Sequence, residues 1–160
     1  MTSGRASLRQ PSGLIATWFG AGLLPRAPGT WGSLAALPFA WVIAWAGGWM
    51  ALAAATVLVF ALGVWAADRE AGRAGAHDPG SIVIDEVAGQ WLTLLAAPLD
   101  PLAYALGFVL FRIVDITKPW PASWADREIK GGIGIMLDDV LAAAYALLVM
   151  LVCRHFLWTP

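Results

Sequence analysis

A long segment without any charged residue, from Ala27 to Ala67, limits the possible folds of this chain more than any other feature. The segment has room for two helices of roughly 20 residues, the length that crosses the apolar core of a bilayer, and Gly47-Gly48 provides a turn signal near its middle. Hydrophobic residues make up 59% of the chain and charged residues 13%, against roughly 25% charged in typical soluble domains. We therefore expect a membrane protein, with a soluble domain of unusually large core as the alternative.

Five apolar segments alternate with polar stretches along the chain. They are rich in Ala and Leu and lack the alternation of strands, which predicts helices. The segments cover about residues 14–24, 33–46, 49–67, 87–111 with a turn at residues 98–101, and 140–158. A chain of 160 residues suffices for one domain. We expect an all-α fold, a compact helical bundle over residues 13–160 after an N-terminal extension at 1–12, with Cys153 as a buried small side chain.

Basic residues are distributed unevenly if the apolar segments fold back on each other at their turns. Residues 1–33, 68–86 and 112–139 then return to one side of the bundle, and Arg154 lies opposite. That side carries the remaining basic residues, Arg5, Arg9, Arg26, Arg69, Arg73, Arg112, Lys118, Arg127 and Lys130. Such an excess marks the cytoplasmic face of membrane proteins. Segments of about 11–14 residues are too short to span a bilayer, so these would be re-entrant or core helices.

The motif PGTWGS, residues 28–33, stands at the start of the charge-free segment. Its glycines allow a close backbone approach to a ligand, and the free N–H groups at a helix N-terminus can bind phosphate. Thr30 and Ser33 are candidate phosphate-binding residues on this reading. A plain turn in which one of the two hydroxyls caps the next helix is the simpler alternative.

Two pairs of adjacent acids precede apolar segments, Asp85-Glu86 and Asp138-Asp139. A carboxylate placed in a membrane costs roughly 2.5–3.5 kcal/mol unless it is neutralised. The helix dipole favours acids in a first turn, so a capping role is one explanation. A shared cation is the other, and oxygen ligands that leave room for water suit Mg²⁺. We therefore expect all four acids to meet around Mg²⁺, reached through a flexible segment with Gly131, Gly132 and Gly134.

Cationic residues near these acids indicate a phosphorylated substrate. Arg112, Lys118 and Arg127 are the candidates for binding its phosphate. Simpler roles are a surface ion pair of Arg112 with Asp115 and a solvated pair of Asp126 with Arg127. Lys118 precedes Pro119, so a helix should stop there. The net charge of −1 gives no indication of a nucleic-acid partner.

Taken together and in this order, the motifs resemble the phosphatidylglycerophosphatase A family. The resemblance covers about residues 13–148 and rests on PGTWGS, HDPGSIVIDE with the following AGQW, FRIVDITKPWP and DREIKGGIGIMLDDV. It implies an all-helical, Mg²⁺-dependent lipid phosphatase of the bacterial inner membrane that converts phosphatidylglycerophosphate to phosphatidylglycerol and phosphate. Carried over by position, the implied active-site residues are Asp85, Glu86, Asp138 and Asp139, surrounded by Asp68, Asp115, Lys118, Asp126 and Arg127.

Other phosphatase classes leave no signature in the chain. It has no Asp-x-Asp nucleophile motif, Cys153-Arg154 lacks the spacing of a cysteine phosphatase loop, and only two histidines are present. Direct attack by water activated by the metal is therefore the expected mechanism, and attack by a carboxylate is the alternative. A phosphatidyl-alcohol transferase, whose Asp-Gly-x-x-Ala-Arg pattern is absent, and a small carrier or channel subunit are the alternatives.

Overall fold

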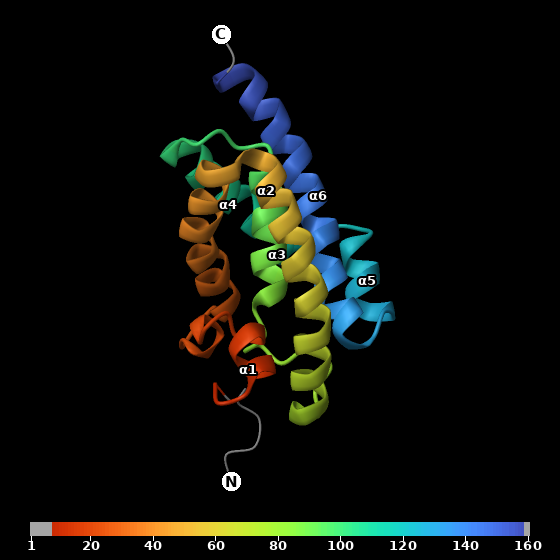
Figure 1. Cartoon of the computed structure of the whole chain (residues 1–160). Coiled ribbons are helices and arrows are strands. Elements are labelled where there is room, and N and C mark those ends of the chain that lie inside the picture. Colours follow the sequence, from red (N-terminus) through yellow and green to blue (C-terminus); the bar gives the residue numbers. More distant parts are fainter. Residues whose placement is uncertain (1–7, 159–160) are drawn as a thin grey trace.

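The structure of this chain is a computed structural model that describes residues 8–158. All its regular elements are helical, and the described residues contain no strand, which confirms the predicted all-α class. In chain order the elements are α1 (Pro11–Ala16), the 3-10 helix η1 (Ala21–Leu23), α2 (Pro28–Ala74), α3 (Ile84–Leu94), α4 (Pro101–Thr117), α5 (Ala122–Glu128) and α6 (Gly131–Leu157). Figure 1 shows the long helices packed side by side, with α1 and the C-terminal end of α6 at opposite ends of the bundle.

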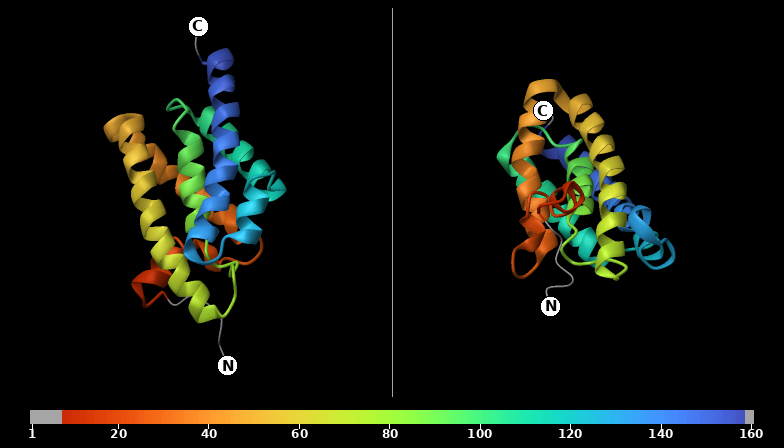
Figure 2. Two further views of the ribbon diagram at one scale, coloured as in Figure 1. Left: turned by 90° about the vertical axis from the view of Figure 1, so that its right-hand side faces the viewer. Right: turned by 60° about the horizontal axis from the view of Figure 1, so that its bottom comes forward.

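Helix α2 is a hairpin of two helical arms rather than one rod. Gly48 has φ 69° and ψ −169°, a conformation that is accessible to glycine because it lacks a Cβ atom. The chain reverses there, at the end of the bundle where α6 also finishes (Figures 1 and 2). The turn predicted at Gly47-Gly48 is therefore present, and it brings the two ends of the charge-free segment back to the same side.

Helix α3 forms the centre of the bundle. Nine of its residues are buried: Ile84, Asp85, Val87, Ala88, Gly89, Gln90, Trp91, Thr93 and Leu94. It packs against α2, α4 and α6, and the Trp91 indole N–H donates to the carbonyl of Ala36 at 2.9 Å. A helix of 11 residues is about 16 Å long and too short to cross a bilayer. Short segments were expected to be re-entrant or core helices, and α3 is a core helix.

The turn between α3 and α4 lies at the predicted prolines. Asp100 caps α4, because its carboxylate accepts the backbone N–H of Ala103 at 2.9 Å. Helix α4 continues to Thr117, and Lys118 then takes a left-handed conformation with φ 41°. The stop expected before Pro119 is therefore present.

Two predicted segments differ from the structure. Residues 14–24 do not form one helix, because Trp18 and Phe19 have positive φ and turn the chain between α1 and η1. Ser12 attaches α1 to α2 by donating to the buried Glu70 at 2.7 Å. Helix α6 begins at Gly131 rather than near residue 140. Cys153, predicted to be buried, is only partly buried.

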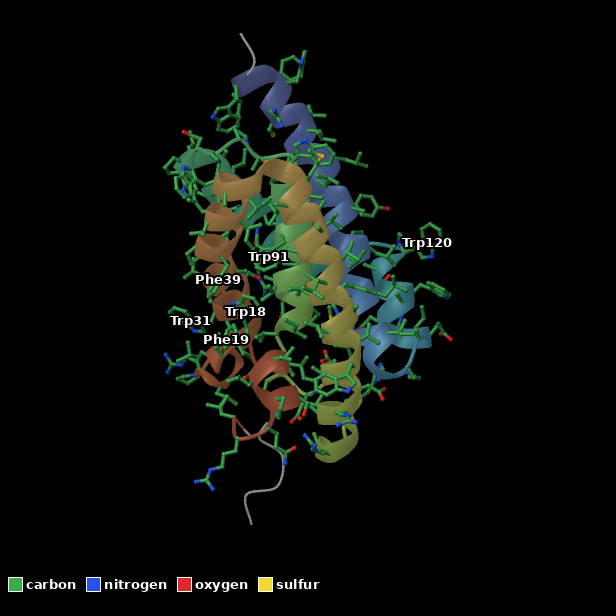
Figure 3. All side chains as sticks on the ribbon, viewed as in Figure 1. Trp18, Phe19, Trp31, Phe39, Trp91 and Trp120 are labelled. Atoms are coloured by element: carbon green, nitrogen blue, oxygen red, sulfur yellow. The ribbon has the colours of Figure 1, made fainter. Side chains whose placement is uncertain are left out.

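Charged and apolar surfaces are separated along the bundle. The loops that precede α2, α3 and α6 gather at one end, while the Gly48 turn and the end of α6 lie at the other (Figure 1). The loop before α5 lies beside the middle of α6, where the carbonyl of Trp120 accepts the Tyr145 hydroxyl at 2.8 Å. Of the basic residues predicted on the polar side, Arg5 lies outside the described residues. Trp45 and Trp49 are exposed beside the far turn, and Trp31 and Trp120 project outward on opposite flanks (Figure 3). Tryptophans at both ends are typical of membrane interfaces.

The flanks of the bundle are apolar. Exposed side chains along the long helices include Val42, Val57, Leu58, Leu102, Val109, Ile113, Leu148, Leu151 and Val152. An apolar surface of this extent marks contact with a membrane or a partner. Helices α2 and α6 are long and apolar enough to cross a membrane.

Candidate active site

Three carboxylates from two helices converge inside the bundle. Asp85 and Glu86 lie in the first turn of α3, and Asp139 lies on the facing side of α6. One oxygen from each of the three lies within 4.8 Å of the others. Asp85 is 7% and Asp139 3% exposed, so water alone cannot screen their mutual repulsion.

The electrostatics of this carboxylate cluster, Asp85, Glu86 and Asp139, are unfavourable without a cation. Burial raises the pKa of Asp85 well above its ordinary value, and the neighbouring charge of Glu86 raises it further. Burial also raises the pKa of Glu86, and the charge of Asp139 raises it further. One buried oxygen on each acid has no hydrogen-bond partner in the described structure: Asp85 Oδ1, Glu86 Oε2 and Asp139 Oδ2. Oxygens of this kind are suitable ligands for a hard divalent cation.

Arg112 of α4 borders the cluster on one side. Its Nη1 lies 2.6 Å from Asp115 Oδ2 and 3.8 Å from Glu86 Oε1, and it donates to Ser33 Oγ at 3.4 Å. The Arg112 side chain is only 14% exposed. The ion pair considered for Arg112 and Asp115 is therefore present, but it is largely buried rather than on the surface, because the arginine is turned into the bundle, toward the acids.

Lys118 borders the cluster on the other side. Its ammonium group donates to Asp138 Oδ2 and, at 3.1 Å, to Asp126 Oδ1. Burial lowers the pKa of Lys118, but the hydrogen bonds and charges of these acids outweigh that effect and raise it. The lysine occupies the left-handed position after α4 that glycine usually takes. The backbone thus places a permanently charged ammonium group beside α6.

The structure separates the predicted site residues into two groups. Near the cluster lie Ser33, Arg112, Asp115, Lys118, Asp126 and Asp138. Three others are elsewhere: Asp68 is exposed and accepts the N–H of Gly132 at 3.1 Å, Arg127 is exposed and donates to the carbonyl of Ser123, and Thr30 is half-buried in the first turn of α2. Asp126 pairs with Lys118 and not with Arg127, so the predicted solvated pair of Asp126 with Arg127 is absent from the described residues.

Two local expectations from the sequence are also wrong. Neither Thr30 nor Ser33 caps α2: the N-cap is Ala27, and both hydroxyl residues lie inside the helix. The glycines before Asp138 are not a flexible approach, because they form the first turn of α6. A Cβ atom at Gly132 would overlap the carbonyl of Val64, and one at Gly134 would overlap that of Ile129. These close contacts hold the segment in place.

Two residues in the quoted motifs gain a role that the sequence did not indicate. Gly29 lies against the cluster, where a Cβ atom would overlap Glu86 Oε1. Gln90 lies one turn after Glu86, is fully buried, and neither amide atom has a partner among the described residues. The signal was present in the motifs PGTWGS and AGQW, but only the packing shows that both residues lie at or next to the acids.

The chain is similar to known proteins over almost its whole length. The family model for phosphatidylglycerophosphatase A matches residues 14–154. A phosphatidylglycerophosphatase A of Escherichia coli is 45% identical over 139 residues, 86% of this chain and 80% of that protein. One from Haemophilus influenzae is 40% identical over 154 residues, 96% of this chain and 94% of that protein.

A further relative has a different name. A Bacteroides thetaiotaomicron protein, provisionally named a phosphatidylinositol-3-phosphatase, is 39% identical over 154 residues, 88% of this chain and 92% of that protein. No solved structure gives a significant match. The family match and the identities above show that this chain is a phosphatase acting on a phosphate monoester, and that it belongs to the phosphatidylglycerophosphatase A family.

Proposed function

We propose that this enzyme is a Mg²⁺-dependent phosphatidylglycerophosphatase, which hydrolyses phosphatidylglycerophosphate to phosphatidylglycerol and inorganic phosphate. The observation that carries the proposal is the convergence of Asp85, Glu86 and Asp139 between Arg112 and Lys118. Two cationic groups on either side of a cation-binding cluster fit a phosphate monoester, which carries up to two negative charges. The family to which the chain belongs supports the identity of the lipid.

The three cluster acids are the proposed Mg²⁺ ligands. Their unpartnered oxygens are buried, and they come from facing helices, so a cation would offset their repulsion. Mg²⁺, when bound, polarises a phosphoryl oxygen and makes a coordinated water a better nucleophile. We infer that Arg112 and Ser33 hold a phosphoryl oxygen on the α4 side, because these two groups are already joined at 3.4 Å.

Asp138 is the proposed proton acceptor. Its Oδ2 is held by Lys118, while its Oδ1 is buried without a partner. In the proposed step a water oxygen attacks phosphorus, the water proton passes to Asp138, and the bond from phosphorus to the glycerol oxygen breaks. The leaving oxygen takes a proton from solvent. Lys118 keeps Asp138 in position and stabilises the charge that develops on the phosphoryl group.

We propose that the site faces the cytoplasm at the inner membrane. Arg154 lies in the last turn of α6, beyond the apolar body of the bundle. The other basic residues of the described chain lie in or next to the loops between helices, or contact the buried acids: Arg9, Arg26, Arg69, Arg73, Arg112, Lys118, Arg127 and Lys130. The positive-inside rule supports this orientation.

Phosphate release from phosphatidylglycerophosphate in detergent micelles tests the function. The unmodified enzyme should release phosphate with Mg²⁺ and not with a chelator, and Asp85→Asn should reduce kcat by at least about 100-fold. Glu128→Gln is the control, because Glu128 is an exposed acid on α5 outside the cluster. Activity that persists without a divalent cation, or in Asp85→Asn, would contradict the proposal.

A further inference from the structure

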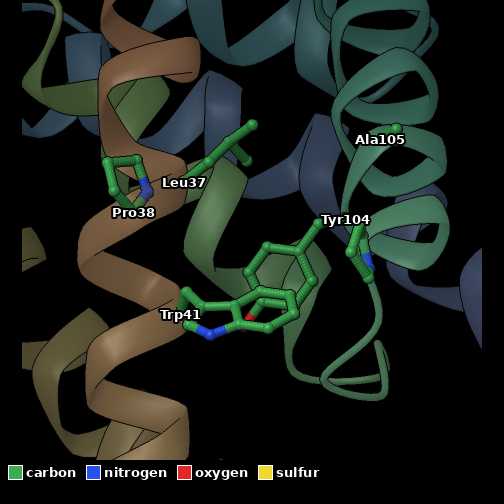
Figure 4. Close-up of a pocket in the computed structure, with 6 residues that line it drawn as sticks. Leu37, Pro38, Trp41, Tyr104 and Ala105 are labelled. Carbon is green, nitrogen blue, oxygen red and sulfur yellow. The ribbon is translucent and has the colours of Figure 1, made fainter.

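An apolar groove lies between the first arm of α2 and α4. It has a volume of about 430 Å³ and is lined by Leu37, Pro38, Trp41, Pro101, Tyr104 and Ala105. Figure 4 shows the two helices on either side, with the Trp41 and Tyr104 rings meeting between them. The ring centroids are 4.9 Å apart in an edge-to-face arrangement. No lining residue carries a charge, so the groove suits hydrocarbon and not a polar ligand.

The groove and the phosphate-binding end of the site lie along the same pair of helices. Ser33 contacts Arg112 at one point, and Trp41 contacts Tyr104 at another. The residue numbers rise along α2 as they fall along α4, so the two segments run antiparallel. Trp41 is eight residues from Ser33, and Tyr104 is eight residues from Arg112. Each separation is about 12 Å along its helix at 1.5 Å per residue. The Trp41–Tyr104 contact therefore lies roughly two turns from Ser33 and Arg112, on the side toward the Gly48 turn. On α2 the groove begins at Leu37, about one turn from Ser33.

Two small or rigid residues keep the groove open on the outer surface of the bundle. Ala105 and Pro38 are both exposed, and neither has a long side chain that could fill the space. Larger apolar side chains stand exposed close by on α4, at Leu102 and Val109. An apolar groove that opens on a lipid-facing flank gains free energy when hydrocarbon fills it.

We propose that this groove holds one acyl chain of the phospholipid substrate while its phosphate is bound near Arg112 and Ser33. The inference rests on the proposed function and extends it, because it assigns Leu37, Trp41, Tyr104 and Ala105 to recognition of the lipid tail. The phosphate then enters at the polar end, and the chain follows α2 and α4 toward the bilayer centre. The enzyme thereby distinguishes a phosphorylated lipid from a water-soluble phosphate monoester.

Photo-crosslinking of the whole enzyme in micelles tests where the chain lies. The probe is phosphatidylglycerophosphate with a diazirine on one acyl chain. The unmodified enzyme is used, and a chelator prevents hydrolysis of the probe. A second probe has the same chain on phosphatidylcholine, which lacks the phosphate monoester. Preferential labelling of peptides with residues 37–41 and 104–105 by the first probe supports the proposal. Equal labelling by both probes, which indicates bulk lipid, or labelling confined to α6, overturns it.

A filled groove tests the same inference through kinetics. Ala105→Trp places a large ring in the groove, and Ala54→Trp is the matched control, because Ala54 is an exposed alanine on the other arm of α2. The readout is the ratio of kcat/KM for long-chain substrate to kcat/KM for its deacylated, water-soluble analogue. Ala105→Trp should lower this ratio about tenfold, the discrimination associated with one methylene in an apolar pocket, and Ala54→Trp should not.

An unchanged ratio in Ala105→Trp overturns the groove assignment, whether both activities stay the same or fall together. Failure of the proposed function gives a different result. In that case the unmodified enzyme releases phosphate from neither substrate with Mg²⁺, while the crosslinking pattern still reports whether the groove binds a chain.

Discussion

The adjacent acids Asp138 and Asp139 have different surroundings because neighbouring positions on a helix point about 100° apart. Asp139 joins Asp85 and Glu86, whereas Asp138 pairs with Lys118. The sequence predicted that the two acidic pairs would meet, but it could not assign the members of each pair. That assignment depends on the rotation of α6, which is set by packing along its whole length.

Substitution of Asp139 should separate stability from cation binding. Asp139→Asn removes one of three buried charges that repel each other, so we expect a higher Tm than the unmodified enzyme in a chelator. Divalent cation should stabilise the unmodified enzyme by about 2.7 kcal/mol at about 100 times its Kd, and the variant should lose this shift. Differential scanning fluorimetry in detergent measures both effects, with Glu128→Gln as the control. A full shift in Asp139→Asn would remove Asp139 from the site.

Lys118 should contribute to stability mainly through Asp138. Lys118→Met leaves a buried acceptor without its partner, which costs about 1–3 kcal/mol. Adding Asp138→Asn should recover part of this loss, so the two effects should not be additive. Denaturant unfolding of the single and double variants measures the coupling. Lys130→Met is the control, since Lys130 is an exposed lysine at the same end of the bundle; strict additivity would show that the pair is unimportant.

At the scale of elements, the sequence predicted turns better than helix starts. Gly47-Gly48 and residues 98–101 turn the chain as expected, because glycine and proline act through the local backbone. The start of α6 was missed because Gly131, Gly132 and Gly134 have low helix propensity. Their helical form depends on contacts with Val64 and Ile129, residues that are distant in sequence or belong to a loop. The aromatic contact of Trp18 with Trp91, at 5.6 Å, likewise fixes the α1–η1 turn through tertiary packing.

The glycines of α2 should respond differently to alanine. Gly29→Ala would displace the Glu86 carboxylate, and a shift of about 1 Å in a catalytic group can cost about 100-fold in rate. Its effect on stability should be small, because Glu86 can rotate away. Gly72→Ala has open space around it and should stabilise the helix by about 0.5–1 kcal/mol without loss of activity. Phosphate release and Tm, measured for both variants, test this contrast; equal activity in the two would contradict the placement of Gly29.

At the scale of the whole molecule, the bundle has a polar end that carries the site and an apolar body. The proposed orientation in the membrane places the end with most of the basic residues in the cytoplasm. In a Cys153→Ser background, Glu128→Cys introduces a thiol at the loop end and Trp49→Cys one at the Gly48 turn, both at exposed positions. A maleimide that cannot cross membranes should label Glu128→Cys from the cytoplasmic side only and Trp49→Cys from the opposite side only. Labelling of both from one side would contradict a spanning arrangement.

Helices α3 and α6 bring Asp85, Glu86 and Asp139 together at the polar end of the bundle. The proposed function requires that these three acids bind a divalent cation. Anomalous X-ray scattering from crystals of the enzyme with Mn²⁺ in place of Mg²⁺ tests this most directly. We expect an anomalous peak within bonding distance of all three carboxylates. A peak bound by other residues, or no peak among these acids at saturating Mn²⁺, would contradict it.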